Sequence, residues 1–562
     1  MFLRGLRIEN FWAIRKTDIS LDDGTSLIGE NDCGTSSVLD ALELVLGHEH
    51  KKQAIPPWLF HRDNSGEPAG KIRIRLMFRE RYRGEWGGGE YSAFESFLAG
   101  YPKRPRELWY ETIITPGEEG KDARVEHRLR SPGVKGTTSD KKIVGRLRRM
   151  NPLIRVSAGM MTGHGRSAEW FEHGDDPALK ISPVVRDLAT RINRAVETRL
   201  TGKSMNLAAD LEDGYDAAYK LLETGSIKLG KWETGLTRSV GEIIGWHADA
   251  DTPESGPMHN PDGNQQRLGI LLLIGALLRA RPGGLAPDAD PLWVIEEPEA
   301  HLHPITLSSV ATLVSLIQRQ KIITTYSGDL LSIMPLRQVR RLVRYDGELI
   351  ERRVKRAVLS RSEQRRFHYH VRSRFSVASF SRMWLLVEGE SEFWILPQLA
   401  RLMGYDFQLE GIACIEFAQC GLDPPLKVAR ELGIEWHLLS DGDDAGQAYS
   451  NAALNYIEEG EKEERMTVLH ESDIERFFWE FGYDHVYRKA AKLPERELAH
   501  MSPARVIRAA VRRHSKPHLA LAVVEAVAGK DSPGIPPVLQ AMIETCVDLA
   551  RRAPERLVSG GS

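Results

Sequence analysis

The segment from Gly29 to Ser37 constrains the fold most, because a turn bounded by glycines joins an extended stretch to a helix there. Residues 2–28 alternate in polarity, as strands do, and SVLDALELVL after the turn has the apolar spacing of a helix. A strand, a tight turn and a helix in this order are the unit from which domains with parallel strands are built. The sequence therefore predicts an α/β fold that begins with this unit.

The turn GENDCGTSS lies where backbone N–H groups and the helix dipole cradle phosphates. Its position matches a Walker A loop, but Thr35 stands in place of the lysine whose ammonium normally reaches the β- and γ-phosphates. Ser36 keeps the hydroxyl that is expected to ligate magnesium. The pattern predicts a phosphate cradle and a metal ligand without the usual cation.

Farther along, the mostly apolar run LWVI ends in Glu296, Glu297, Pro298 and Glu299, which resembles the Walker B and D-loop segment of ABC-type ATPases. By that resemblance Glu296 holds the magnesium shell and Glu297 positions the attacking water. The simpler interpretation is an acidic, solvated turn. With Gln265 from a signature-like segment, the residues expected to bind nucleotide are Gly29, Asn31, Gly34, Thr35, Ser36, Ser37, Glu296 and Gln265.

Two further positions depart from the ABC pattern. Asp262 replaces the signature serine that would approach a partner's γ-phosphate, and Tyr326 replaces the switch histidine. A carboxylate at the signature position would repel phosphate. Together with Thr35, these departures predict weak ATP binding and slow turnover.

Acidic clusters follow two strands of the C-terminal half. MWLLV, which ends at Val387, precedes EGESE, and WHLLS precedes DGDDAG about fifty residues later. In a parallel sheet both clusters lie at the carboxyl edge. Magnesium or manganese ions bound to such oxygen ligands clamp the attacking and leaving oxygens of a phosphodiester. An acidic surface turn accounts for either cluster alone but poorly for the pair.

VEGESE and SDGDD resemble the two parts of the Toprim pattern, a glutamate at the end of one strand and Asp-x-Asp after a later strand. Together with the ABC-like half in front, nearly the whole chain is similar to the OLD (overcoming lysogenisation defect) family of ATP-linked endonucleases. The resemblance implies two Mg²⁺ or Mn²⁺ ions, with metal ligands Glu388, Glu392, Asp441, Asp443, Asp473 and Glu475. It also implies that Lys516 stabilises charge on the phosphate, although a lysine before proline is otherwise a solvated side chain. The expected catalytic residues are Glu388, Asp441, Asp443, Lys516 and Glu297.

These patterns predict an α/β chain with an ABC-type ATPase domain, a Toprim domain and a helical C-terminal segment. The domain boundaries that we expect are 1–176 for the first part of the ATPase, 177–244 for a helical insertion suited to dimerisation, 245–358 for the second part, 359–381 for a basic linker, 382–525 for Toprim and 526–562 for a helical tail.

The net charge is −2, so the protein as a whole does not attract nucleic acid electrostatically. Any surface that binds nucleic acid must be a local basic patch. Residues 337–382 carry fourteen Lys or Arg and four Asp or Glu, so their local charge is +10. This segment is either a solvated connector or a track for a phosphate backbone. The helical pattern ARVIRAAVRRH before Lys516 places several arginines on one face, suited to hold a DNA strand beside the metals.

The four cysteines have spacings of neither a disulfide framework nor a zinc knuckle, which indicates a reducing compartment. The N-terminal sequence lacks a signal-peptide core, and the longest apolar run is too short to cross a bilayer. We therefore expect a cytoplasmic protein.

Two functions of different classes fit these observations. The first is a divalent-metal DNA endonuclease under the control of a degenerate ATPase domain, with a role in phage defence or DNA repair implied by resemblance alone. The second is a non-catalytic DNA sensor or scaffold similar to RecF and SMC proteins. The family resemblance implies assembly as a homodimer or larger homo-oligomer through the ATPase half. The sequence does not distinguish DNA from RNA as the substrate.

The missing Walker A cation leads to a testable prediction. Thr35→Lys should increase nucleotide affinity, because an ammonium would again reach the β- and γ-phosphates. Titration of ATP into the parent and the variant measures the change. Equal affinities would refute the interpretation of the turn as a nucleotide cradle that lacks its cation.

Overall fold

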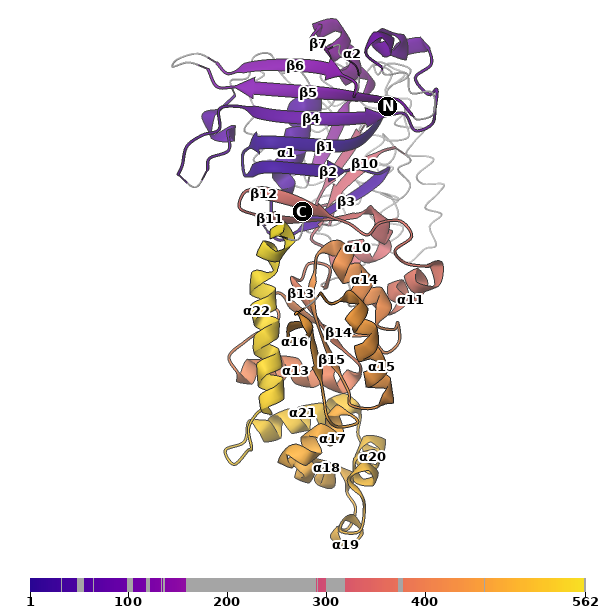
Figure 1. Ribbon diagram of the computed structural model, residues 1–562, viewed down its shortest axis with the longest axis vertical. Coiled ribbons are helices and arrows are strands. Elements are labelled where there is room, and N and C mark those ends of the chain that lie inside the picture. Colours follow the sequence, from indigo (N-terminus) through magenta and orange to yellow (C-terminus); the bar gives the residue numbers. More distant parts are fainter. Residues whose placement is uncertain are drawn as a thin grey trace, which may run out of the picture. The chain divides into compact units, whose positions relative to one another are not determined.

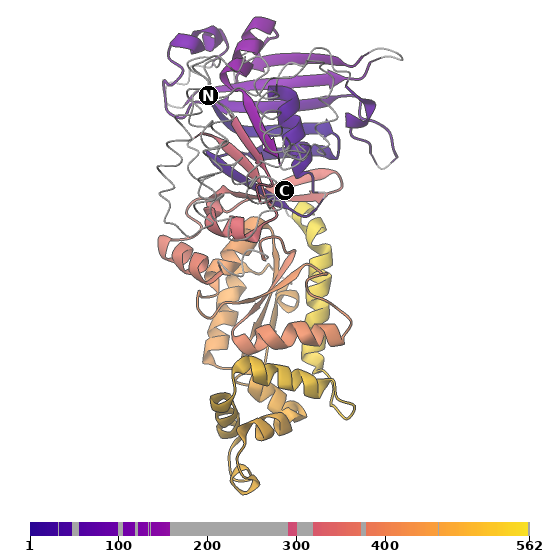
Figure 2. The same cartoon turned by 180° about the vertical axis from the view of Figure 1, so that it is seen from behind.

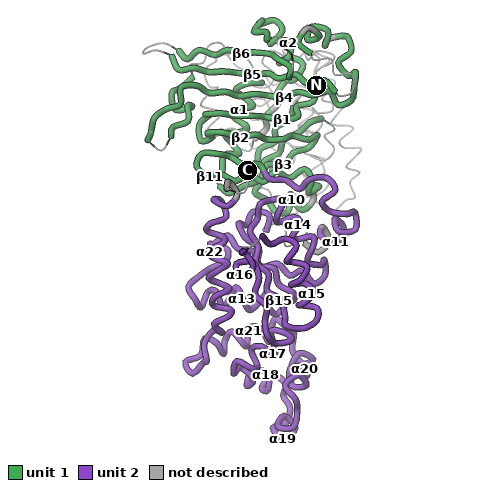
Figure 3. Tube along the Cα trace, in the orientation of Figure 1, with its two compact units in different colours: residues 1–351 green, residues 352–562 purple. Residues whose placement is uncertain are grey.

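The fold is seen in a computed structural model of the chain (Figure 1). It forms two compact units, unit 1 (Met1–Glu351) and unit 2 (Arg352–Ser562) (Figure 3). The residues that the structure describes are 1–31, 33–47, 55–63, 65–98, 105–117, 122–132, 134, 137–157, 290, 292–299, 319–371, 378–458 and 460–559. The expected helical insertion at 177–244 lies outside them.

Unit 1 contains one mixed sheet, which has twelve strands within the described residues, in the order β7-β6-β5-β4-β1-β2-β12-β11-β3-β10-β9-β8. Its antiparallel part is formed by β1 (Phe2–Phe11), β2 (Ile14–Ser20), β4 (Ile72–Arg79), β5 (Glu107–Thr115), β6 (Arg124–Arg130) and β7 (Thr137–Thr138). The strands expected at KIRIRLMF, ELWYETII and RVEHRLR are β4, β5 and β6. They extend the sheet as a meander, as their alternating polarity predicts.

The other part of this sheet is mostly parallel. The pairs β8–β9, β9–β10, β10–β3 and β3–β11 are parallel, and β12 runs parallel to β2. Their bounds are β3 (Gly24–Gly29), β8 (Leu153–Ser157), β9 (Leu292–Glu296), β10 (Lys321–Thr324), β11 (Val339–Tyr345) and β12 (Glu348–Arg352). The described helices of unit 1 are α1 (Thr35–Leu46), α2 (Lys141–Met150) and α10 (Gly328–Ile333). The glycine turn joins β3 to α1, as expected.

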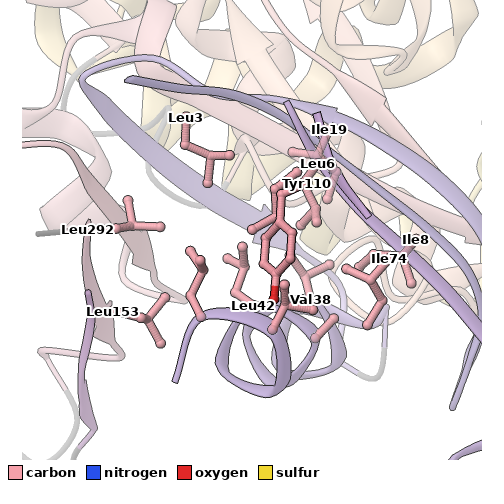
Figure 4. Packing of buried hydrophobic residues seen from close by; sticks show 14 of the residues in the cluster. Leu3, Leu6, Ile8, Ile19, Val38, Leu42, Ile74, Tyr110, Leu153 and Leu292 are labelled. Carbon is pink, nitrogen blue, oxygen red and sulfur yellow. The ribbon is translucent and has the colours of Figure 1, made fainter. Parts of the chain in front are cut away.

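Helix α1 covers the sheet through its apolar face (Figure 2). Val38 and Leu42 lie on the helix side of this core, and Leu6, Ile8 and Tyr110 lie on the strand side, all at most 1% exposed (Figure 4). Side chains of α1 and of both parts of the sheet pack in this one core, and the packing holds α1 at the end of β3.

Unit 2 contains a smaller sheet with all neighbouring strands parallel, in the order β14-β13-β15-β16. The strands are β13 (Met383–Val387), β14 (Ile412–Glu416), β15 (Glu435–Ser440) and β16 (Met466–Val468). Every residue of β13 and β15 is buried, which is expected where helices cover both faces of a parallel sheet. Helices α15 and α22 lie on opposite sides of it in Figure 1 and Figure 2.

The helices of unit 2 alternate with these strands and then continue without them. Their bounds are α11 (Arg361–Val371), α13 (Glu390–Leu402), α14 (Asp423–Leu432), α15 (Asp444–Ala453), α16 (Lys462–Arg465), α17 (Ile474–Phe478), α18 (Asp484–Ala491), α19 (Glu495–Leu498), α20 (Pro503–Arg513), α21 (Lys516–Val527) and α22 (Pro537–Ser559). The expected C-terminal tail contains α22, whose apolar face joins the core of unit 2. The predicted α/β class and helical C-terminal region are thus confirmed.

The basic segment 337–382 serves more than one structural purpose. In unit 1, the buried guanidinium of Arg340 lies 2.8 Å from an oxygen of Asp22 and 3.0 Å from one of Glu351. In unit 2, part of the expected linker 359–381 forms α11, where Glu363 accepts a 2.6 Å hydrogen bond from Lys427 of α14. Arg340 therefore has a structural role, and Glu363 anchors α11 through a lysine outside the basic segment. No described helix is long and apolar enough to span a bilayer.

His437 is a fully buried titratable group in the centre of β15. Its Nδ1 lies 2.8 Å from the carbonyl oxygen of Glu464, and its Nε2 lies 2.9 Å from Oγ1 of Thr467. Burial lowers the pKa of His437 to about 4. The folded protein therefore keeps this imidazole neutral at pH values where an unfolded chain, with a histidine pKa of about 6.5, binds a proton.

His437 should make the free energy of unfolding fall as pH drops from about 6.5 to 4, by at most about 1.4 kcal/mol per pH unit. In His437→Gln this decrease should be shallower, because glutamine keeps a neutral polar group and binds no proton. Urea unfolding followed by tryptophan fluorescence at several pH values measures both slopes. The exposed His500→Gln is the control and should keep the parent slope. Equal slopes in His437→Gln and the parent would contradict the assignment.

Candidate metal centre

The carboxyl ends of three strands of unit 2 lie at one edge of the small sheet. Val387 at the end of β13 pairs with Leu439, and Ser440 at the end of β15 pairs with Val468. The residues that follow these strands therefore emerge side by side. Glu388 and Asp441 are the first residues beyond β13 and β15, so the structure brings the two acidic clusters together as the sequence predicts.

Glycines make the turn after β15 tight enough to place two aspartates there. A Cβ at Gly442 would lie 2.6 Å from the carbonyl oxygen of Leu469, and one at Gly446 would lie 2.0 Å from that of Asp441. Any side chain at these positions would therefore displace the backbone. The N–H of Gly442 donates to the carbonyl of Glu471 at 2.8 Å, which joins this turn to the loop after β16.

Glu392 and Glu475 are buried carboxylates beside the edge, 5% and 8% exposed. Glu392 lies in the first turn of α13 and Glu475 in the first turn of α17. The hydroxyl of Ser391 donates to Oε1 of Glu475 at 2.6 Å, and Nζ of Lys516 lies 3.8 Å from the same oxygen. The predicted late lysine, at the start of α21, thus belongs to this cluster.

The carboxylates disfavour one another's charge. Burial, with Glu392 and Glu388 as the nearest acidic contributors, raises the pKa of Asp441 to about 8. Burial and the charge of Glu475 raise the pKa of Glu392 to about 7, and burial with Asp443 raises the pKa of Glu388. Lys516 opposes both glutamate shifts. Negative charge at this edge is therefore costly unless a cation is added.

Two oxygens of the cluster suit an added cation. Among the described residues, no hydrogen-bond donor reaches Oε2 of Glu388 or Oδ1 of Asp441, although both atoms are buried. Within the described residues, no group of three or more His, Cys, Asp or Glu side chains is already arranged to hold a metal ion. Hard carboxylate oxygens with free lone pairs fit Mg²⁺ or Mn²⁺, which complete their shells with water and substrate oxygens.

Asp443 and Asp473 also act as helix N-caps. Oδ1 of Asp443 accepts the N–H of Gly446 at 2.8 Å at the start of α15. Oδ1 of Asp473 accepts the N–H of Arg476 at 2.7 Å, and its Oδ2 accepts the hydroxyl of Ser472 at 3.0 Å. One carboxylate oxygen of Asp443 therefore has no described partner, whereas both oxygens of Asp473 accept hydrogen bonds. A ligand role for Asp473 stays a prediction.

Ser391 is a site residue that the sequence analysis did not single out. It lies between two glutamates in the helical turn after β13, and its hydroxyl orients Glu475 from 84 positions along the chain. A serine among acidic residues carries a weak signal. Only the approach of α17 to α13 shows what its hydroxyl binds.

The nucleotide-like turn of unit 1 has the expected backbone. A Cβ at Gly29 would lie 2.4 Å from Sγ of Cys33, and Gly34 has a φ of +111°, in the region that favours glycine. Oγ1 of the buried Thr35 lies 3.5 Å from the hydroxyl of Tyr326. The two residues that replace the Walker A lysine and the switch histidine therefore contact each other.

Glu296 ends β9 and Glu297 follows it, but the two carboxylates are not both open to a ligand. Arg155 of β8 donates to Glu296 from Nη2 at 2.8 Å and from Nε at 3.1 Å. Glu297 has a φ of +46°, and burial followed by the charges of Glu296 and Glu299 raises its pKa. Gln265 lies outside the described residues. With Thr35 in place of lysine and Glu296 already paired, the described residues do not fit magnesium-bound nucleotide in the ABC manner.

Comparison with known proteins places these features in a family. A family model described as a protein of unknown function (DUF2813) matches residues 1–378. A curated relative, the uncharacterized protein YbjD of Escherichia coli (strain K12), is 32% identical over 569 residues, which cover 98% of this chain and 99% of that protein. The chain belongs to the DUF2813 family.

The C-terminal half carries a second match. A model described as the TOPRIM domain of overcoming-lysogenization-defect-like proteins covers residues 380–443, which include Glu388, Glu392, Asp441 and Asp443. This confirms the predicted OLD-like Toprim domain and supports a nuclease-type function. Asp473, Glu475 and Lys516 lie beyond the matched segment, and their functional roles stay predictions.

Solved structures overlap with parts of the chain. The C-terminal region of the Xanthomonas campestris pv. campestris OLD protein is 19% identical, covers 32% of this chain and 97% of its own, and gives a TM-score of 0.27. The SMC head domain from Thermotoga maritima is 13% identical, covers 63% of this chain and 100% of its own, and gives a TM-score of 0.33. Because both scores are low, we assign the fold from sheet order and the family models.

The repulsion at the sheet edge predicts opposite effects of one substitution with and without metal. In EDTA, Asp441→Asn should raise the free energy of unfolding, on the order of 1 kcal/mol, because the amide removes one charge from the crowded carboxylates. With Mg²⁺ or Mn²⁺ present, the parent should be stabilised more than the variant. Thermal unfolding of both proteins under each condition measures this. If metal stabilises the two equally, Asp441 is not a ligand.

Proposed function

We propose that the protein is a divalent-metal-dependent DNA endonuclease that hydrolyses phosphodiester bonds at the carboxylate edge of its Toprim domain. The observation that carries the proposal is the pair of buried, unpartnered oxygens on Glu388 and Asp441. These atoms belong to the first residues after β13 and β15, which are neighbouring parallel strands. Their residues fall within the segment that matches the OLD-like Toprim model.

Glu388, Glu392, Asp441 and Asp443 are the residues that would hold Mg²⁺ or Mn²⁺, with Glu475 adjacent. Mg²⁺ or Mn²⁺ held there would supply Lewis-acid charge for the scissile phosphate and would lower the pKa of an attacking water. Ser391 orients the carboxylate of Glu475 through its 2.6 Å hydrogen bond. The carboxylates raise the pKa of Lys516 although burial opposes this, so its ammonium stays charged near the phosphate.

Helix α20 supplies a surface for the substrate. Arg505, Arg508 and Arg512 are exposed on α20 with the spacing of one helical face. The next helix, α21, begins with Lys516 and contacts α20. A phosphate backbone that runs along these arginines would continue to the carboxylate edge, and this is our reason for proposing DNA as the partner.

Unit 1 would exert weak nucleotide control on cleavage, since its turn lacks a lysine and its signature and switch positions are altered. We further propose assembly as a homodimer or larger homo-oligomer through this unit, and a role in phage defence or DNA repair. A scaffold without catalysis is the alternative, and it predicts metal-independent DNA binding with no cleavage.

Cleavage of supercoiled plasmid tests the central proposal. We expect nicked or linear DNA with Mg²⁺ or Mn²⁺, none with EDTA, and no products from Asp441→Ala, because that side chain is a metal ligand. Gel electrophoresis after incubation with each metal, with and without ATP, measures cleavage, metal dependence and nucleotide control together.

The matched control is Asp444→Ala, which removes the third aspartate of the same turn. Asp444 is exposed and begins α15. This variant should cut as the parent does. Equal cleavage by Asp441→Ala and the parent would show that the site is wrongly assigned, and binding without cleavage under every condition would favour the scaffold.

The arginines of α20 give an independent prediction. The double variant Arg508→Gln, Arg512→Gln should bind DNA more weakly, and the slope of log affinity against log salt should decrease by about 2, since two phosphate contacts are lost. Fluorescence anisotropy over a range of salt concentrations measures the slope. Arg496→Gln on α19, also exposed, should leave it unchanged. If the double variant keeps the parent's slope of log affinity against log salt, DNA does not contact these two arginines of α20.

A further inference from the structure

Arg155 is the centre of a partly buried ion-pair cluster between α1 and β9. Its side chain is 6% exposed and lies on β8. Its Nη1 donates to Asp40 at 2.6 Å and to Glu43 at 2.7 Å, while Nη2 donates to Glu296 at 2.8 Å. A single guanidinium thereby joins two carboxylates of α1 to the carboxylate at the end of β9.

The charge balance of this cluster depends on the guanidinium. The three carboxylates carry up to three negative charges against one positive charge. Burial raises the pKa of Glu43, while Arg155 opposes that shift. The three carboxylates together raise the pKa of Arg155 although burial opposes this, so the guanidinium remains ionised. Without it, α1 and β9 would present uncompensated negative charge to each other.

We propose that Arg155 is a resident cation between α1 and β9 and occupies the Glu296 carboxylate that an ABC-type ATPase would offer to magnesium. In unit 1, α1 then stays packed against the sheet without a bound metal and without a Walker A lysine. The contact between Thr35 and Tyr326 agrees with this, because two uncharged side chains meet where charged groups would face the phosphates. Arg155 is a positioning residue for Glu296, and this proposal stands whether or not unit 2 cleaves DNA.

Substitution of Arg155 should convert the cluster into a metal site. Asp40, Glu43 and Glu296 would keep their oxygens close together with no cation between them, which suits Mn²⁺ or Mg²⁺. The test uses the full chain in an Asp441→Asn, Asp443→Asn background, so that the carboxylate edge of unit 2 does not bind the added metal. Calorimetric titration with Mn²⁺ and thermal unfolding in EDTA and in Mn²⁺ are the measurements.

We expect Arg155→Met to unfold at a lower temperature in EDTA, to regain much of that loss in Mn²⁺ and to bind one more Mn²⁺ per chain than the background protein. Arg155→Lys keeps the charge and should gain no site. Arg149→Met, which removes an exposed arginine of α2, should match the background in both measurements. Equal loss of stability by Arg155→Met in EDTA and Mn²⁺, with no added binding, would overturn the proposal.

A second variant covers the case in which Arg155→Met does not fold. With Arg155 in place, Glu296→Gln should leave the Mn²⁺ binding of the background protein unchanged, because Glu296 is already paired. Loss of a bound Mn²⁺ in Glu296→Gln would show that Glu296 is a metal ligand despite Arg155. That result would overturn the proposal without bearing on cleavage by unit 2.

Discussion

Mutual repulsion among carboxylates at the edge of the small parallel sheet is the constraint on which the chemistry of unit 2 depends. The parallel pairing of β13 with β15 places Glu388 and Asp441, the first residues after these strands, at one edge of the sheet, and the loop after β16 is tied to the same turn. Burial then makes their charge costly, which raises both pKa values. This cost is the basis of our proposal that a divalent cation binds there.

Unit 1 meets a similar problem in a different way. Asp40, Glu43 and Glu296 also gather at the end of a parallel strand, but Arg155 supplies the positive charge from within the chain. The two clusters contrast at their strand ends: Glu388 and Asp441 in unit 2 have buried oxygens without described hydrogen-bond partners, whereas Glu296 in unit 1 is already paired, although Oε2 of the nearby Glu299 is also buried without one. This contrast is why we propose catalysis by the Toprim domain and only weak nucleotide control by unit 1.

The parts of the fold that follow from local pattern were predictable. Alternating polarity indicated β4, β5 and β6, and the apolar runs that precede Glu388 and Asp441 indicated buried parallel strands. The OLD-like domain followed from two short motifs, and a family model confirms it. Helix α11 was less predictable, because its sequence is strongly basic and reads as a solvated linker until Lys427 of α14 provides a partner for Glu363.

By itself, the sequence determined the α/β class, the glycine turn before α1 and the placement of two acidic clusters after strands, because periodicity and turn chemistry are local properties. Only the tertiary structure decided which charges meet. Arg155 lies more than one hundred positions from both α1 and Glu296, and Ser391 lies 84 positions from Glu475. Pairing over such separations depends on strand order and helix packing, which no local pattern encodes, and it decides which carboxylates remain available to a metal.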